Sequence, residues 1–360
     1  MKRCPACRCE YPEDAKFCTR DGTRLVGDAD ATMDVRRTAA RAQAAGVPTG
    51  AAAAAGAGGG GQLAGSVLDG RYRIERKVGE GGMSFVYLAT DVVSQEACAI
   101  KVLSGSMSHD TNAMARLKRE AGLGMRLAHP NVCHIIRMGE TSEGLVYVVM
   151  PFVEGEILAE RNQRMGHLGL DELVPLVRDI AAGLHVAHEL KIVHRDLKPE
   201  NIMICPGLGG TEYAVVMDFG LAKERLAGAE LQKLTATGII MGTPEFMSPE
   251  QLRGRPLDRR TDIYSLSLVV YETLTGRLPF QGRTQQEMMA ARLRGDPVPL
   301  RRLQPDMTFP EAVEQVLIKA LARNPDDRYQ TALEFAEAFT RAAGDAGSTG
   351  NERVSRRVGR

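Results

Sequence analysis

The most informative part of the sequence is Ile192-Val193-His194-Arg195-Asp196-Leu197-Lys198-Pro199-Glu200-Asn201. It brings a carboxylate, an ammonium group and a carboxamide within six residues, next to a proline. Asp196 can accept the proton of an attacking hydroxyl, and Lys198 can neutralise charge on a moving phosphoryl group. Asn201 can ligate a divalent cation. The three roles together suit phosphoryl transfer.

Further motifs stand on both sides of this loop. Upstream lie Gly79-Glu80-Gly81-Gly82-Met83-Ser84-Phe85-Val86, Ala99-Ile100-Lys101 and Glu120, and downstream lie Asp218-Phe219-Gly220 and Ser248-Pro249-Glu250. Over roughly residues 71 to 340 this set resembles the protein-kinase signature, in its Ser/Thr-specific, Hanks-type form and most like the bacterial members. The conjunction of motifs is far more specific than any one of them. The resemblance implies an α+β, bilobal fold: a small β-rich lobe with one key helix, and a large, mainly helical lobe. The amphipathic segment at about residues 110–127 is the expected key helix.

The resemblance also implies an ATP site. In the glycine-rich turn, backbone N–H groups can approach phosphates without a side chain in the way, and Ser84 replaces the third glycine of the family pattern. Lys101 lies in an apolar strand and therefore needs an anionic partner, which by resemblance is Glu120. Met150 guards the adenine pocket, where the backbone of Pro151 and Val153 would bond the base. The implied ATP-binding residues are Gly79, Glu80, Gly81, Gly82, Met83, Ser84, Val86, Ala99, Lys101, Met150, Pro151 and Val153.

By the same resemblance the catalytic residues are Asp196, Lys198, Lys101 and Glu120, and Asn201 and Asp218 hold Mg²⁺ or Mn²⁺. Lys198 within Asp-Leu-Lys-Pro-Glu-Asn is typical of the Ser/Thr form, so the expected enzyme is a non-specific serine/threonine protein kinase acting on protein substrates. The rival interpretation is a catalytically silent nucleotide-binding scaffold. Such proteins usually lack the base, the lysine or a metal ligand, and this sequence retains all of them.

The segment after Gly220 contains the candidate phosphosites. Thr235 and Thr237 are candidates for activation-loop autophosphorylation, which implies a transient homodimer, and a phosphate there could pair with Arg195. Thr243 has another implied role, since by resemblance it hydrogen-bonds the catalytic loop and shapes the floor of the substrate site.

Three further residues have implied structural roles in the large lobe. Arg328 matches the family position whose guanidinium pairs with Glu250, a bidentate contact that lysine would not reproduce. Asp262 begins a nearly all-apolar helix, which we expect to be the buried pillar of the large lobe. A long helix at residues 171 to 190 should lead into the catalytic loop.

The first residues carry clustered cysteines. Cys4 and Cys7 form a Cys-x-x-Cys pair, Cys18 follows, and Asp21 stands where short zinc ribbons usually have a fourth cysteine. This spacing resembles a zinc ribbon at residues 1–26 with a structural Zn²⁺, whose fourth ligand could be Asp21, Cys9 or water. The alternative is a disordered, oxidisable thiol tail.

Composition sets the remaining expectations. The ribbon is followed by an Ala/Gly-rich flexible linker at 27–66, the kinase domain at 67–342 (small lobe 71–153, large lobe 154–342) and a disordered basic tail at 343–360. With 46 Lys+Arg against 45 Asp+Glu, the charge balance does not favour a nucleic-acid partner. No apolar run is long enough to span a membrane and no signal peptide is recognisable, so a cytoplasmic protein is expected. The ribbon and linker are expected to recruit a protein partner or to tether the kinase.

Overall fold

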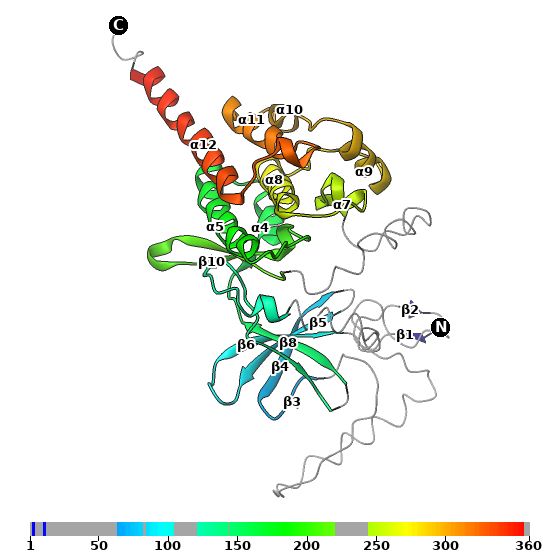
Figure 1. The fold of residues 1–360 in the computed structure, drawn as a ribbon. Helices are drawn as coiled ribbons and strands as arrows, with labels where there is room; N and C mark the ends of the chain where they lie inside the picture. Colours follow the sequence, from blue (N-terminus) through cyan, green and yellow to red (C-terminus); the bar gives the residue numbers. More distant parts are fainter. Residues whose placement is uncertain are drawn as a thin grey trace, which may run out of the picture. The chain divides into compact units, whose positions relative to one another are not determined.

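The computed structural model describes residues 2–3, 10–11, 63–81, 84–103, 121–142, 144–219 and 244–355. Contacts divide the chain into two units, Met1–Leu63 and Ala64–Arg360. In the first unit the described residues form one antiparallel pair, β1 (Lys2–Arg3) with β2 (Glu10–Tyr11). The second unit contains the sheet and the helices drawn in colour in Figure 1.

The small lobe is built on a six-stranded antiparallel sheet with the order β3-β4-β5-β6-β8-β7. Successive side chains of a strand point to opposite faces of the sheet. Along β4, Tyr72 and Ile74 are accordingly buried, whereas Arg73 and Glu75 are exposed. The sheet therefore keeps one apolar face. Its strands are β3 (Val67–Leu68), β4 (Tyr72–Gly81), β5 (Ser84–Asp91), β6 (Ala97–Leu103), β7 (Arg137–Glu140) and β8 (Val146–Pro151).

A second, three-stranded antiparallel sheet has the order β11-β10-β9. Its strands are β9 (Glu156–Ile157), β10 (Ile202–Pro206) and β11 (Glu212–Val216), and the short turn η2 (Leu208–Gly210) joins the last two. Because β10 begins directly after Asn201 and β11 ends just before Asp218, this hairpin fixes the separation of the two expected metal ligands.

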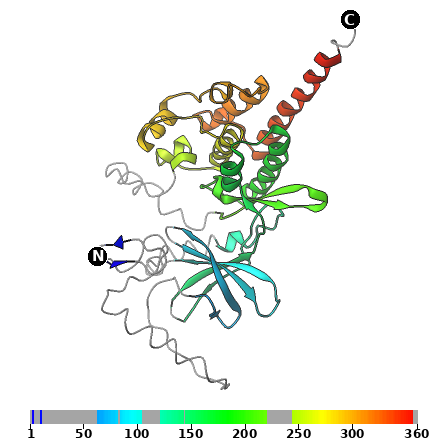
Figure 2. The same ribbon diagram turned by 180° about the vertical axis from the view of Figure 1, so that it is seen from behind.

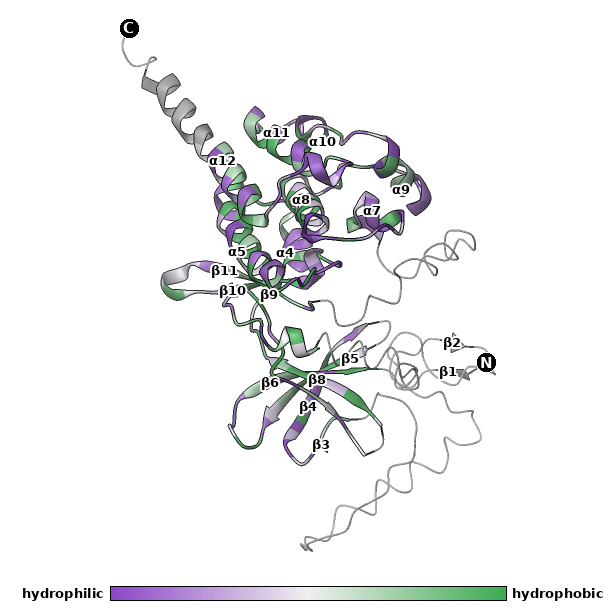
Figure 3. Ribbon diagram, viewed as in Figure 1, coloured by the Kyte–Doolittle hydropathy of each residue, from purple (hydrophilic) through white to green (hydrophobic). Residues whose placement is uncertain are grey.

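The large lobe is helical, as Figure 1 and the view from behind in Figure 2 show. Polar and apolar residues are mixed around its helices in Figure 3, as amphipathic helices require. The predicted architecture of a β-rich small lobe and a helical large lobe is confirmed. The helices are α4 (Leu158–Met165), α5 (Leu170–Glu189), α7 (Pro249–Leu252), α8 (Arg259–Thr275), α9 (Gln285–Arg294), α10 (Leu300–Leu303), α11 (Glu311–Ala320) and α12 (Ala332–Ser355), with single turns at η1 (Pro199–Asn201), η4 (Pro244–Phe246) and η5 (Pro325–Asp327).

Helix α8 is the pillar of the lobe, because nearly every side chain from Thr261 to Thr275 is buried. At its start the Asp258 side chain accepts a hydrogen bond from the Arg260 N–H, and it ends at Gly276 with φ of 67°. A Cβ at Gly276 would lie 2.6 Å from the carbonyl oxygen of Gly166. Both the positive φ and this close approach therefore require glycine at the position.

The first strand of the sheet, β3, begins at Val67, and the two residues before it are bonded to β4: the Gly65 N–H donates to the Ile74 carbonyl (2.8 Å) and the Ile74 N–H donates to the Ser66 carbonyl (2.9 Å). At the other end, α12 continues to Ser355, where a disordered tail was predicted from residue 343. The first half of α12 is anchored by buried Phe335 and Phe339, and extending a formed helix needs no new nucleus.

Two further expectations concern segments that the structure describes only in part. The key helix of the small lobe was expected at about 110–127, of which the structure describes only the part from residue 121. In the described parts of the chain, no helix combines the length and apolar character needed to cross a bilayer.

Candidate active site

The loop between α5 and β10 brings the predicted catalytic side chains together. Lys198 Nζ lies 3.8 Å from Asp196 Oδ2. Asn201 Nδ2 donates to the Asp196 carbonyl oxygen (2.8 Å) and lies 3.3 Å from Asp196 Oδ2. Because its amino group is used in this way, the remaining Oδ1 of Asn201 is the atom that suits a hard cation.

Asp262 holds this loop from below. Its fully buried carboxylate accepts the backbone N–H of His194 (2.8 Å) and of Arg195 (2.9 Å), and it bonds His188 Nε2 (2.7 Å). Burial alone would raise the pKa of Asp262, but these partners hold the pKa below its ordinary value. Arg195 has a φ of 65°, a left-handed conformation that a fixed partner must maintain. The carboxylate thus sets the backbone directly before Asp196.

The second expected metal ligand is tied to the same loop. The Met217 N–H donates to the Asn201 carbonyl (2.8 Å), and the Met217 carbonyl bonds His194 Nε2 (2.8 Å). The His194 and Phe219 rings lie 4.7 Å apart in an edge-to-face contact. Asp218, which stands between these anchored residues with a φ of 55°, is therefore placed relative to Asn201 by the backbone itself.

Lys101 reaches this group from β6. It is buried, and its Nζ lies 2.8 Å from Asp218 Oδ1. Glu120, its predicted partner, lies outside the described residues. In the described part of the chain the anionic partner that a buried lysine needs is thus the Asp218 carboxylate.

The glycine-rich turn joins β4 to β5, where Gly79 faces Val86, Glu80 faces Phe85 and Gly81 faces Ser84 in the antiparallel register. Gly82 and Met83 lie outside the described residues. The next strand brings Ala99 opposite Met150, and Met150 is buried in the small-lobe core.

The hinge follows β8. Within the described residues the backbone N–H of Val153 has no hydrogen-bond acceptor, which leaves it available to a nucleobase. The Cys133 thiol lies 3.8 Å from the Pro151 carbonyl oxygen. The Val153 N–H and the Pro151 carbonyl oxygen are the two atoms expected to bond the adenine base.

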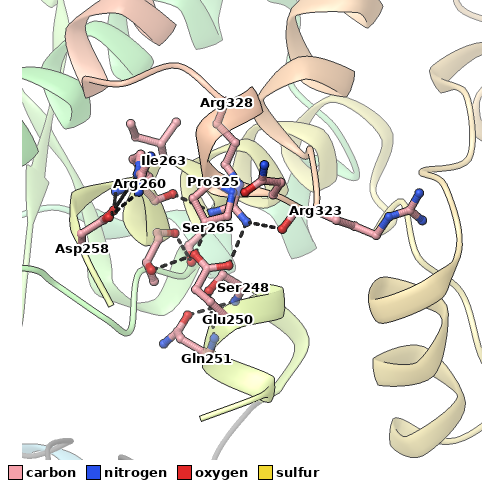
Figure 4. Close-up of polar contacts among 12 residues, drawn as sticks. Ser248, Glu250, Gln251, Asp258, Arg260, Ile263, Ser265, Arg323, Pro325 and Arg328 are labelled. Atoms are coloured by element: carbon pink, nitrogen blue, oxygen red, sulfur yellow. Dashed lines mark hydrogen bonds and ion pairs between the residues drawn. The ribbon is translucent and has the colours of Figure 1, made fainter. Parts of the chain in front are cut away.

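An ion pair beneath the site joins two distant segments (Figure 4). Arg328 Nη1 and Nη2 lie 2.7 and 2.8 Å from the two carboxylate oxygens of Glu250. Burial would raise the pKa of Glu250, but Arg328 outweighs it and keeps the pKa below its ordinary value. Thr261 Oγ1 donates a further hydrogen bond to the same carboxylate (2.9 Å). The bidentate pair expected from the sequence is therefore confirmed by its two short contacts, and both of its side chains are buried.

Sequence reasoning missed several polar contacts. Gln251 Nε2 donates to the Arg195 carbonyl (2.7 Å), which ties the Ser-Pro-Glu segment to the catalytic loop. Ser248 and Gln251 form a capping box at the start of α7. The S/T-x-x-Q pattern would have signalled the cap. Nothing in the local sequence predicts the contact between Gln251 and Arg195, which are far apart in the chain.

A cavity of about 520 Å³ lies beside the catalytic loop. Its lining includes Pro199 and Glu200 after the catalytic lysine, Glu245 and Phe246 of η4, and Glu272 of α8. Burial, with repulsion from Glu200 and Glu245, raises the pKa of Glu272 to about 7.

Other predicted residues cannot be placed. Thr235, Thr237 and Thr243 lie outside the described residues, as do Cys4, Cys7, Cys9, Cys18 and Asp21. Within the described ranges no cluster of His, Cys, Asp and Glu could hold a metal ion.

The fold and this arrangement of residues define a protein kinase. The family model described as protein kinase domain matches residues 72–339, and the chain belongs to that family. Among curated relatives, it is 35% identical to "Serine/threonine-protein kinase pkn3" of Myxococcus xanthus, covering 76% of this chain and 50% of the relative. It is 36% identical to "Serine/threonine-protein kinase PrkC" of Bacillus subtilis, covering 81% and 43%. It is 39% identical to "Serine/threonine-protein kinase PknB" of Mycolicibacterium smegmatis, covering 74% and 42%.

The matched region thus spans half or less of the length of these relatives. Among solved structures, the kinase domain of Mycobacterium tuberculosis PknI superposes with a TM-score of 0.61 at 27% identity. That comparison covers 78% of this chain and 99% of the other.

Proposed function

We propose that the protein is a serine/threonine protein kinase that transfers the γ-phosphoryl group of ATP to hydroxyl groups of protein substrates. The observation that carries this proposal is the convergence of Asp196, Lys198 and Asn201 in one loop with the Lys101–Asp218 ion pair beside it. The named Ser/Thr kinases among its relatives support the same acceptor class.

In the proposed reaction Asp196 accepts the proton of the acceptor hydroxyl, whose oxygen attacks the γ-phosphorus. The bond between that phosphorus and the β–γ bridging oxygen breaks, and ADP leaves. Lys198 and Lys101 carry the positive charge that offsets charge on the phosphoryl oxygens. Bound Mg²⁺, held by Asn201 Oδ1 and Asp218, would neutralise further phosphate charge.

The test is incubation of the purified chain with γ-labelled ATP, Mg²⁺ and a protein acceptor. Label on Ser or Thr residues supports the kinase. Bound nucleotide with no transferred label would support the alternative, a catalytically silent scaffold.

We propose further that Thr235 and Thr237 are autophosphorylated, through a transient homodimer, and that a phosphate there pairs with Arg195. The support is positional, because both threonines follow the Asp-Phe-Gly motif and Arg195 precedes the catalytic carboxylate. Mapping of labelled residues tests this: label confined to other sites would contradict it.

For the N-terminal unit we propose a structural zinc site with Cys4, Cys7 and Cys18, and with Asp21, Cys9 or water as the fourth ligand. The antiparallel pairing of Arg3 with Glu10 supports it, since this pairing brings together the residues on either side of the stretch with Cys4, Cys7 and Cys9, and Cys18 and Asp21 follow later in the sequence. Metal analysis should find one zinc per chain, lost in a Cys4→Ser/Cys7→Ser variant. An equal zinc content in the wild type and in this variant would contradict the proposed zinc site.

The role proposed for this unit is to recruit a protein partner, while the kinase remains cytoplasmic. Deleting residues 1–62 retains the bonds of Gly65 and Ser66 to the sheet. The shortened chain should therefore keep its phosphoryl transfer and lose partner capture. A large loss of intrinsic transfer would contradict this division.

A further inference from the structure

Arg292, on α9, is a buried arginine that the proposed mechanism does not use. Its side chain is completely buried, although α9 lies near the surface over much of its length. Within the described ranges no carboxylate lies within ion-pair distance of its guanidinium, and its Nε has no acceptor. Burial lowers the pKa of Arg292. An unpaired buried cation is costly, and an apolar side chain of similar volume is often neutral or stabilising at such a position.

The partners of Arg292 are backbone carbonyls of a single segment. Nη1 donates to the carbonyls of Pro244 (2.6 Å) and Met247 (3.0 Å), and Nη2 donates to the carbonyl of Glu245. The remaining carbonyl, that of Phe246, accepts from Ser265 Oγ (2.8 Å). Four consecutive carbonyls are thus held, three of them by one guanidinium.

This segment forms part of the wall of the cavity beside the catalytic loop. Its lining includes Glu245 and Phe246, together with Pro199 and Glu200 just after Lys198. Met288, also on α9, contributes to the same lining. The planar guanidinium can reach several diverging carbonyls at once, which lysine cannot do. Arg292 therefore ties this wall of the cavity to α9.

We propose that Arg292 is a positioning residue for the protein acceptor, because it fixes the Pro244–Met247 wall of the cavity that receives the chain around the acceptor hydroxyl. The inference rests on the proposed kinase function. It assigns Arg292 no contact with ATP, whose expected binding residues lie on the glycine-rich turn, β6 and the hinge.

The test uses the full-length protein with myelin basic protein as the acceptor. Arg292→Met should raise KM for the acceptor about tenfold, the equivalent of about 1.4 kcal/mol. KM for ATP and the slow hydrolysis of ATP by water should stay within about twofold of the wild type. Arg292→Lys should give an acceptor KM between those of the wild type and Arg292→Met, because one ammonium group can replace only part of the hydrogen bonding of the guanidinium.

Arg323→Met is the matched control. Arg323 also donates to two carbonyls, those of Arg294 (2.8 Å) and Gly295 (2.7 Å) at the end of the same helix, but it does not line the cavity. Its replacement should leave the acceptor KM unchanged. If Arg292→Met does not fold, Arg292→Lys and Ser265→Ala, which frees the Phe246 carbonyl, must each raise the acceptor KM.

Three outcomes would overturn the inference. One is an unchanged acceptor KM in the folded Arg292 variants. Another is a parallel loss of ATP affinity and hydrolysis, which would mark a general structural role. The third is an equal effect of Arg323→Met. If the wild type transfers no phosphoryl group, the proposed function fails first, so the two failures are distinguishable.

Discussion

Lys101 Nζ lies 2.8 Å from Asp218 Oδ1, and this ion pair joins β6 of the small lobe to the segment that follows β11. Lys101 is buried, so its ammonium group needs the carboxylate or a phosphate in its place. The pair brings a group expected to bind phosphate next to a group expected to bind metal.

Replacing Lys101 should therefore affect the chemical step. Lys101→Met should lower phosphoryl transfer on the order of 10²-fold or more, because a positive charge aimed at the phosphates is lost. Lys101→Arg should retain part of the activity. The control is Lys319→Met, an exposed lysine of α11, which should transfer label at the wild-type rate. Equal rates in Lys101→Met and the control would contradict the assignment.

The Glu250–Arg328 pair predicts a large stability effect. Arg328→Met should lower the free energy of unfolding by about 3–5 kcal/mol, because it leaves a buried carboxylate unpaired. The double variant Glu250→Leu/Arg328→Met should recover much of this loss. Arg260→Met removes partly exposed ion pairs with Asp258 and Asp326 and should cost about 1 kcal/mol or less. Denaturant unfolding measures the free energy of unfolding of all three variants. A double variant that is no more stable than Arg328→Met would contradict this prediction.

Asp262 should influence catalysis through the backbone that it holds. Asp262→Asn replaces one of the two acceptor oxygens with an amide NH2 group, which would face the N–H of either His194 or Arg195, so the catalytic loop should shift. We expect kcat to fall about tenfold or more while ATP still binds. Asp179→Asn is the control, since Asp179 also accepts a backbone N–H, that of Ala214, but away from the loop. A similar fall of kcat in both variants would count against a specific role.

The pH dependence of stability should report Glu272. Its pKa is raised to about 7 in the folded protein, so between about pH 4.5 and 7 the folded state binds the proton more tightly than the unfolded state does. Stability should therefore decrease by about 1–3 kcal/mol as the pH rises from 5 to 8. Glu272→Gln should flatten this slope and melt higher than the wild type at pH 8. Glu337→Gln, an exposed control, should keep the wild-type slope. Identical slopes in all three proteins would refute the prediction.

The sequence predicted the architecture well because motifs and periodicity are local signals. The long helix expected at 171–190 is α5, at Leu170–Glu189. The order of motifs also indicated the convergence at Asp196 and Asp218. The family resemblance, rather than any local rule, indicated the pairing of Glu250 with Arg328, which are far apart in the chain.

The contacts that sequence reasoning missed depend on tertiary packing. Arg292 lies in α9 (Gln285–Arg294), a short helix of mixed polar and apolar residues, and the carbonyls of Pro244, Glu245 and Met247 that make its burial tolerable are distant in the sequence. The bond from Gln251 to the Arg195 carbonyl likewise joins distant segments. The helical extension to Ser355 was missed because composition alone does not reveal that a preceding helix is already anchored.

The most direct test of the central claim compares the wild type with Asp196→Asn. The amide cannot accept the acceptor proton, but it keeps the size of the side chain. We predict that label transfer from ATP falls about 10²-fold or more while the Kd for ATP changes by less than about threefold. Transfer that persists at the wild-type rate in Asp196→Asn would contradict the account.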